Sequence, residues 1–288
     1  MRSEEEMLDL ILNYARRDED VRAVVMNGSR VNSNAKIDLF QDYDIIYFVR
    51  NVEPYRHNWE LTRYFGELMI LQTPEDMSEP PAANKGFYSY LMQFKDGNRI
   101  DLSFYSINSI PECMQDTLTV MLIDKDNLIG KLPPPSDRGY LPQRPTVKAF
   151  DDCCNEYWWL NPYVAKGLWR DELTYARYML DTLMREQLMK MLTWYYGTNT
   201  NFEKSPGKLG KYLKGQIEDE LWTMLEGTYA DANLDHTWEA LFVMGDLFRR
   251  VAQPVADHLG FIYPEQEDRN VSEFIRRIKQ LPRDAKTI

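Results

Sequence analysis

The sequence has few cysteines and histidines, the residues that build disulfide frameworks and zinc sites. Its 288 residues include three cysteines, Cys113, Cys153 and Cys154, and three scattered histidines. Three cysteines cannot build a disulfide framework, and no histidine or cysteine pair has zinc-ligand spacing. We therefore expect the cysteines to act as small buried hydrophobic residues, and we expect no zinc site.

Long hydrophobic runs are also missing. No segment approaches the roughly eighteen uncharged apolar residues that a membrane-spanning helix requires. The first residues, MRSEEE, are acidic where a signal peptide would be basic and then apolar. We therefore expect a cytoplasmic protein without a membrane partner.

Positive charge is in short supply. The 45 acidic residues outnumber the 34 lysines and arginines, which leaves a formal net charge of −11. A nucleic acid is held by a basic surface, so this balance argues against a nucleic-acid partner. It favours a cationic ligand instead, although most acidic soluble proteins carry such charge for solubility alone.

Hydrophobic periodicity predicts a mixed sheet flanked by helices in the first half of the chain. Helices are expected at 3–17 and 54–65. Asp96-Gly97-Asn98 indicates a hairpin turn, because these residues tolerate positive φ. The short apolar runs that predict strands are 21–26, 43–49, 68–71, 87–94, 99–105 and 118–123.

A proline-rich segment, KLPPPSDRG at 131–139, follows these strands. Consecutive prolines lack amide donors and fix φ, so neither helix nor sheet continues easily through them. We therefore expect an α+β protein of two domains. The mixed sheet and its helices occupy 1–135, and an all-α helical bundle occupies 136–288.

The second domain repeats apolar residues at spacings of three and four, as helices do. Helices are expected at 168–196, 217–226, 238–259 and 271–281, with Gly197, Gly227 and Gly260 as stops. The residues expected in the bundle core are Trp158, Trp159, Tyr178, Met179, Leu183, Met184, Leu188, Met191 and Leu192.

Asp42 and Asp44 stand at the start of the expected strand 43–49. Side chains two apart on a strand point the same way, so the two carboxylates would share one small volume. Carboxylates that close repel each other unless a cation offsets them, and Mg²⁺ takes such hard oxygen ligands. The alternative is a solvated strand end, which is the commoner meaning of an isolated Asp-x-Asp.

Two further features favour a site. Gly28-Ser29 follows the expected strand 21–26, where a glycine lets the backbone approach a phosphate and a serine can hydrogen-bond it. Asp101 lies between apolar neighbours in 99–105 and would add a third carboxylate if that strand lay beside 43–49. An acid at such a position costs free energy unless a metal or a proton compensates for it.

This pattern resembles the nucleotidyltransferase superfamily of the polymerase-beta type. More narrowly, NGSR, FQDYDIIYFV, DGNRIDL and MLTWYYG are similar to the aminoglycoside 6-adenylyltransferases, the streptomycin-modifying enzymes. The likeness runs in register to about Gly197 and more loosely beyond it. The segments CCNEYWW and PYVAKGL are its narrower signature.

The resemblance implies transfer of AMP from ATP to a hydroxyl of an aminoglycoside, with streptomycin the expected acceptor and pyrophosphate the leaving group. It implies two Mg²⁺ ions, because charge must be neutralised on both sides of the transferred phosphate. Asp42 and Asp44 would be metal ligands. Asp101 would bind the metal on the nucleophile side and accept or orient the hydroxyl proton.

The remaining candidates bind substrates. Gly28, Ser29 and Arg30 would hold the triphosphate. Lys166 could also reach it, or could be a solvated helix lysine. Acids such as Asp152 and Glu156 could recognise cationic groups of the aminoglycoside, and a tryptophan, Trp158 or Trp159, could stack on them; for the tryptophans, a place in the core is the alternative.

Two other functions remain open at this point. One is a nucleotidyltransferase with a different small-molecule or protein acceptor, and the other is a relative that binds ligands without catalysis. The intact acids at 42, 44 and 101 disfavour the second. The sequence leaves a monomer and a homodimer equally open.

Overall fold

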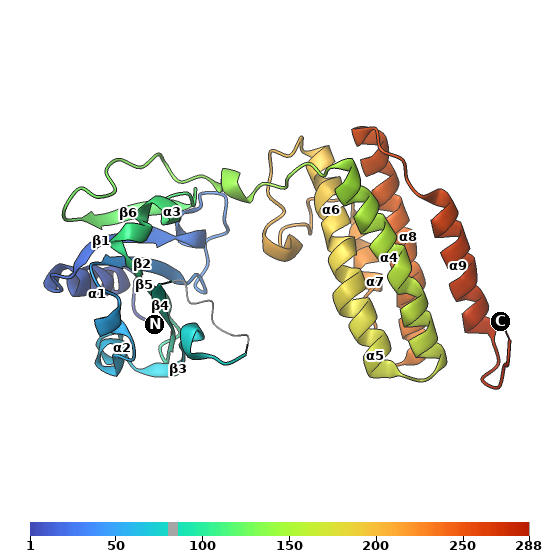
Figure 1. The fold of residues 1–288 in the computed structure, drawn as a ribbon, viewed down its shortest axis with the longest axis horizontal. Coiled ribbons are helices and arrows are strands. Elements are labelled where there is room, and N and C mark those ends of the chain that lie inside the picture. The colour runs from blue at the N-terminus through green and yellow to red at the C-terminus, as the bar shows by residue number, and fades with distance from the viewer. Residues whose placement is uncertain (80–85, 288) are drawn as a thin grey trace. The chain divides into compact units, whose positions relative to one another are not determined.

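The computed structural model describes residues 1–79 and 86–287, and the chain divides into two compact units, Met1–Gly139 and Tyr140–Ile288 (Figure 1). The division falls at the end of the proline-rich segment. In the described ranges, no helix has the length and apolar character needed to cross a membrane.

Six strands of the first unit form one mixed sheet in the order β3-β4-β5-β2-β1-β6. All expected strands are present, each end within one residue of its expected place. β2 and β5 run parallel, whereas the other neighbours are antiparallel. The strands are β1 (Val21–Asn27), β2 (Tyr43–Val49), β3 (Leu68–Gln72), β4 (Phe87–Phe94), β5 (Arg99–Ser106) and β6 (Thr119–Asp124).

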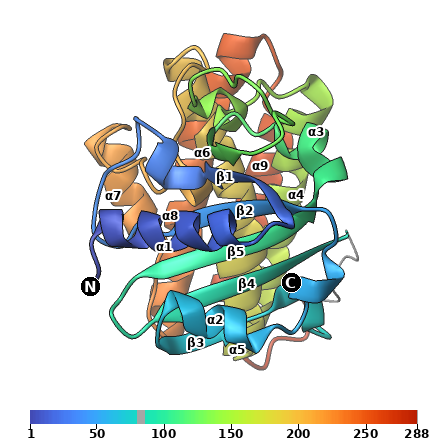
Figure 2. The same ribbon diagram turned by 90° about the vertical axis from the view of Figure 1, so that its left-hand side faces the viewer.

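Helices α1 (Glu4–Arg17) and α2 (Trp59–Phe65) cover one face of this sheet (Figure 2). Ser3 starts α1 with a capping box, in which its hydroxyl accepts from the Glu6 amide and the Glu6 carboxylate accepts from the Ser3 amide. The expected helix 54–65 is wrong in its first half. A 3-10 turn, η2 (Glu53–Tyr55), comes first, and His57 at a φ of +56° breaks the chain before α2.

Strand alternation divides the apolar side chains between two cores. Tyr43, Ile45 and Tyr47 of β2 belong to the core beneath α1 and α2. Phe48 of β2 lies on the other face in a smaller core with Ile110 of α3 (Ile110–Cys113). Even-numbered positions near the start of β2 therefore face away from α1 and α2.

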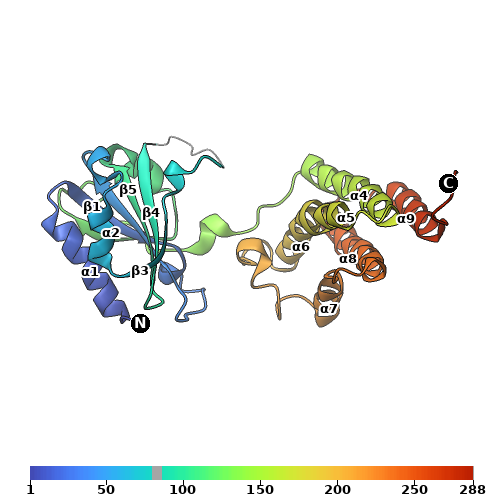
Figure 3. The same cartoon turned by 90° about the horizontal axis from the view of Figure 1, so that it is seen from below.

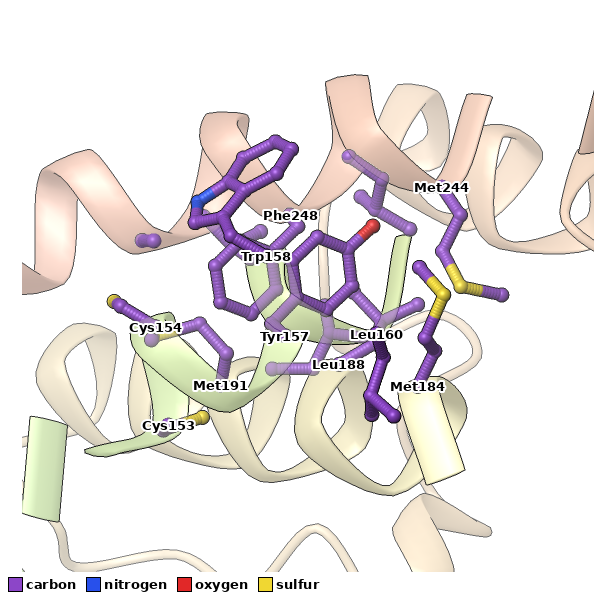
Figure 4. Packing of buried hydrophobic residues seen from close by; sticks show 14 of the residues in the cluster. Cys153, Cys154, Tyr157, Trp158, Leu160, Met184, Leu188, Met191, Met244 and Phe248 are labelled. Carbon is purple, nitrogen blue, oxygen red and sulfur yellow. The ribbon is translucent and has the colours of Figure 1, made fainter. Parts of the chain in front are cut away.

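The described residues of the second unit form helices around one core, with α9 beside α4 and α8 beside α6 (Figures 1 and 3). Inside this core the Tyr157 ring stacks on Phe248 with centroids 3.7 Å apart, and Cys153 and Cys154 are buried nearby (Figure 4). The elements are α4 (Val147–Trp169), α5 (Leu173–Tyr178), a π-helical segment (Met179–Met184), α6 (Arg185–Asn199), α7 (Asp219–Gly227), α8 (Leu234–Leu259) and α9 (Glu265–Gln280).

The expected helix 168–196 is not continuous. α4 ends at Trp169, and Asp171 adopts a φ of +64° in the turn before α5. Gly260 ends α8 in the left-handed conformation, as expected. Gly197 does not end α6. It lies inside the helix, where a Cβ would be 2.5 Å from the Phe202 ring.

Two aromatic residues expected in the core are on the surface. Trp158 is 2% exposed, but Trp159 is 63% exposed. Neighbouring helix positions point about 100° apart, so both side chains could not face the same core. Tyr178 is also exposed, at 55%. Of the cysteines, Cys153 and Cys154 are buried and Cys113 is half-buried, and all are free thiols.

Candidate active site

The register of the central strands brings the predicted acids together. Asp44 of β2 lies directly opposite Asp101 of β5 in the parallel pair, and it also faces Asn27 of β1 on its other side. Asp42 precedes β2 by one residue and is half-buried. The condition set for Asp101, that its strand lie beside 43–49, is therefore met. We call Asp42, Asp44 and Asp101 the acid cluster.

Arg99 is the cation of this cluster. Its Nε and Nη2 atoms donate to the two carboxylate oxygens of Asp101 at 2.7 and 2.8 Å. The same Nε lies 3.6 Å from Oδ2 of Asp42. Arg99 and Asp101 are two residues apart on β5, so strand alternation places both side chains on one face. The spacing of two between Arg99 and Asp101 was visible in the sequence, but acids alone do not indicate Arg99 as part of the site.

The charges of the cluster are incompletely balanced. The pKa of Asp44 is raised to about 6, first by burial and then by the negative charges of Asp101 and Asp42, while Arg99 opposes these effects. Burial also raises the pKa of Asp42, against the positive charge of Arg99. The folded site therefore favours an additional positive charge beside these carboxylates.

Gly28 begins the turn η1 (Gly28–Val31) directly after β1, with a φ of +81°. A Cβ atom here would lie 2.1 Å from Oδ2 of Asp44, so glycine is required both for the backbone conformation and for this close approach. Ser29 is half-buried. In the part of the chain that the structure describes, its hydroxyl has no hydrogen-bond partner, which leaves it available to a ligand.

Arg30 is engaged with the segment that leads into β2. Its guanidinium lies 3.7 Å from the centroid of the Tyr43 ring. Its Nε donates to the carbonyl of Asp42 at 3.1 Å, and its Nη2 donates to the carbonyl of Gln41 at 2.8 Å. These contacts fix the backbone from which the Asp42 side chain extends.

Asn27 and Asp116 border the cluster, although neither is among the site residues expected from the sequence. The Asn27 side-chain amide donates to Asp116 Oδ2 at 3.1 Å, and Asp116 Oδ1 accepts from the Leu118 amide at 2.9 Å. Asp116 adds to the negative charge that raises the pKa of Asp44. Asn27 directly precedes Gly28 in the motif NGSR, so its place near the site could have been inferred from the sequence. Nothing in the sequence around Asp116 points to the site.

The donor atoms of the cluster fit a divalent cation. Three carboxylates supply hard oxygen ligands of the kind that Mg²⁺ takes. As they stand, no three Asp, Glu, His or Cys side chains within the described residues are arranged to hold a metal ion. At the acid cluster, Arg99 engages both oxygens of Asp101. A cation shared by all three acids would therefore compete with Arg99 for Asp101.

Comparison with known proteins identifies the family. The family model described as streptomycin adenylyltransferase matches residues 1–278. The chain belongs to the streptomycin adenylyltransferase family. It is an adenylyltransferase enzyme, and the resemblance read from its motifs is confirmed.

Curated proteins named aminoglycoside 6-adenylyltransferase are similar to this member of the streptomycin adenylyltransferase family over nearly their whole length. A protein of Campylobacter jejuni named aminoglycoside 6-adenylyltransferase is 41% identical over 97% of each chain. One of the same name from Bacillus subtilis (strain 168) is 38% identical over 93% of this chain and 95% of its own. The crystal structure of an aminoglycoside 6-adenyltransferase from Bacillus subtilis covers 98% of this chain and all of its own, with 33% identity and a TM-score of 0.49.

The other predicted site residues of this family member lie on α4, in the second unit. Asp152, Glu156 and Trp159 are all exposed and follow one another at spacings of four and three, so they share one face of the helix. The Trp159 ring meets Tyr163 edge-on with centroids 6.4 Å apart. Asp152 is paired with Lys148 one turn earlier.

Lys166 lies further along α4 and is half-buried. It lines a cavity of about 240 Å³ together with Trp169, Arg170 and Lys286. The charged residues that line this cavity are all basic, which suits an anion. Its assignment to the nucleotide remains a prediction.

Proposed function

We propose that this adenylyltransferase transfers AMP from ATP to a hydroxyl group of an aminoglycoside, with streptomycin as the first candidate. The curated relatives named aminoglycoside 6-adenylyltransferase support the class of acceptor. The observation that carries the proposal is the pairing of Asp44 with Asp101 across parallel strands, beside Asp42. Three acids meeting at one point suit phosphoryl chemistry assisted by divalent cations.

In the proposed reaction, the acceptor oxygen forms a bond to the α-phosphorus of ATP. The bond from that phosphorus to the bridging oxygen breaks, and pyrophosphate leaves with the electron pair. Mg²⁺ held by Asp42, Asp44 and Asp101 would neutralise the charge on the reacting phosphate. Asp101 would orient the acceptor hydroxyl and receive its proton.

The turn after β1 is the proposed phosphate site. Gly28 brings the backbone close to Asp44, and the Ser29 hydroxyl can donate to a phosphate oxygen. Arg30 would act mainly through its hold on the Gln41 and Asp42 carbonyls. Lys166 is a further candidate for the triphosphate, as the basic character of its cavity allows.

The exposed face of α4 is the proposed aminoglycoside site. Carboxylates of Asp152 and Glu156 can accept charge-assisted hydrogen bonds from ammonium or guanidinium groups. Trp159 presents its ring to solvent, where it can stack on such a cation. In this proposal, residues 1–135 carry the chemistry and residues 136–288 supply acceptor recognition.

The direct test incubates the purified protein with ATP, Mg²⁺ and streptomycin and measures pyrophosphate release, with mass spectrometry of the drug for the added AMP. Release that depends on streptomycin supports the proposal. Release with another aminoglycoside alone corrects the acceptor. Release with none of a panel of aminoglycosides contradicts the proposed substrate class.

A further inference from the structure

We propose that Arg99 is a positioning residue that serves as the resident cation of the acid cluster, and that it competes with a divalent cation for Asp101. This inference rests on the proposed function, because the incoming cation is the one that adenylyl transfer would use. The role of Arg99 can be tested by metal binding and thermal unfolding, without measuring enzyme activity.

The contacts of Arg99 show competition for the same atoms. Its guanidinium engages both oxygens of Asp101 and lies 3.6 Å from Oδ2 of Asp42. A metal ion that ligates Asp101 competes with Arg99 for these two oxygens, although each oxygen keeps a second lone pair. Its positive charge also lowers the affinity of the cluster for any second cation, since like charges at this range repel.

The position of Arg99 permits it to move. Its side chain is 39% exposed, compared with 20% for Asp101, and it is the first residue of β5, next to the hairpin turn. Displacing this guanidinium would therefore leave Asp101 in partial contact with solvent. The opposite case occurs in the second unit, where Arg249 holds Asp268, a carboxylate only 6% exposed, and the pair is confined by its neighbours.

Removing the charge of Arg99 should have two effects of opposite sign. Without metal, the acid cluster loses its cation, so the carboxylates repel one another and the protein is less stable. With metal, the same variant loses a competitor and binds the cation more tightly. Removing an arginine whose ion pair lies away from the acid cluster would produce the first effect alone.

The experiment titrates Mn²⁺, in the absence of nucleotide and drug, into the wild-type protein and Arg99→Met, using calorimetry and thermal unfolding. We expect a Kd for Mn²⁺ lower by about 10-fold or more in R99M, which corresponds to roughly 1.4 kcal/mol. We also expect a lower Tm without metal and a larger rise in Tm on adding Mn²⁺. If R99M does not fold, Arg99→Gln replaces it with the same expectation, because the amide can still donate to Asp101 without the charge.

Arg22→Met is the matched control. Arg22 also lies in the sheet and pairs through its guanidinium with one carboxylate, that of Asp126. R22M should lose stability while keeping the wild-type affinity for Mn²⁺. Equal or weaker Mn²⁺ binding by R99M, relative to wild type, would overturn the inference. The pyrophosphate assay on the wild-type protein judges the proposed function separately, so either idea can fail alone.

Discussion

Gly28 and Asp44 are in direct contact across the end of two strands, with room for no side-chain atom between them. A Cβ on Gly28 would come within 2.1 Å of Oδ2 of Asp44. The turn that is proposed to hold phosphate and the carboxylate that is proposed to hold metal are thus built as one unit. Any enlargement of the turn must displace the carboxylate.

Gly28→Ala should therefore inactivate the enzyme. The added methyl group meets Asp44, and alanine is strained at a φ of +81°. We expect at least about 100-fold lower kcat/KM, because a displacement near 1 Å at the reacting groups has that order of effect. Kinetics of AMP transfer with streptomycin provide the measurement.

Gly130→Ala is the control for this variant. Gly130 has a φ of +69°, and nothing lies within 4 Å of its would-be Cβ. Both variants carry a similar backbone strain of about 1–2 kcal/mol. G130A should lose stability alone, so equal loss of activity in the two variants would attribute the effect to strain rather than to contact with Asp44.

Asp42→Asn should abolish turnover while leaving the fold intact. The Asp42 side chain is 38% exposed, and its ion pair is the 3.6 Å approach to Arg99, so the amide costs little stability. The loss of a proposed metal ligand should lower kcat by about 10³-fold or more. Asp38→Asn, in the exposed part of the same segment, should retain full activity. Turnover near the wild-type rate in D42N would remove Asp42 from the site.

Trp159→Ala should weaken aminoglycoside binding specifically. The side chain is 63% exposed, so its removal should cost less than about 0.5 kcal/mol of stability. We expect a several-fold rise in KM for streptomycin, with KM for ATP unchanged, in steady-state kinetics. Trp158→Ala is the contrast, because truncating this buried neighbour should cost about 3–5 kcal/mol. A KM for streptomycin that is the same in W159A and wild type would contradict the proposed drug site.

The strands and the shared face of Asp42 and Asp44 were open to prediction from sequence because alternation is a local signal. Each strand combines apolar residues with clear turn signals, and the Asp-x-Asp spacing determines that both acids share a face. The parallel pairing of β2 with β5 is a long-range relation. From the sequence, Asp101 could therefore be placed in the cluster only on the condition that its strand lies beside 43–49.

The failures have equally specific causes. Trp159 and Tyr178 are apolar residues in apolar helical segments, which favours a place in the core. The direction in which each side chain leaves its helix decides its exposure, and both point to solvent. The break between α4 and α5 depends on Asp171, which has a positive φ. Positive φ is uncommon for residues other than glycine, so an aspartate in the sequence does not by itself predict this conformation. Arg30 is expected at the triphosphate because it follows Gly28-Ser29, and its hydrogen bonds to two backbone carbonyls could be seen only in three dimensions.

The stability of the helical unit should depend on pH through Asp268. Burial opposes ionisation of this carboxyl, but hydrogen bonds from Arg249, Tyr263 and Ser272 outweigh it and hold its pKa below the usual range. A folded-state pKa below the unfolded value stabilises the protein above the unfolded value, near pH 4, and this stability is lost as the pH falls through the folded pKa.

Asp268→Asn tests this dependence. At pH 7 we expect a loss of about 3–5 kcal/mol, because the variant leaves Arg249 without its buried partner. The difference from wild type should shrink as the pH falls below about 4. Urea unfolding followed by tryptophan fluorescence reports on this unit, since every tryptophan except Trp59 lies within it. Asp246→Asn, which removes an exposed partner of the same arginine, should cost less than about 1 kcal/mol at either pH. A D268N deficit that stayed constant from neutral pH down to pH 3 would show that the ionised carboxylate is not its source.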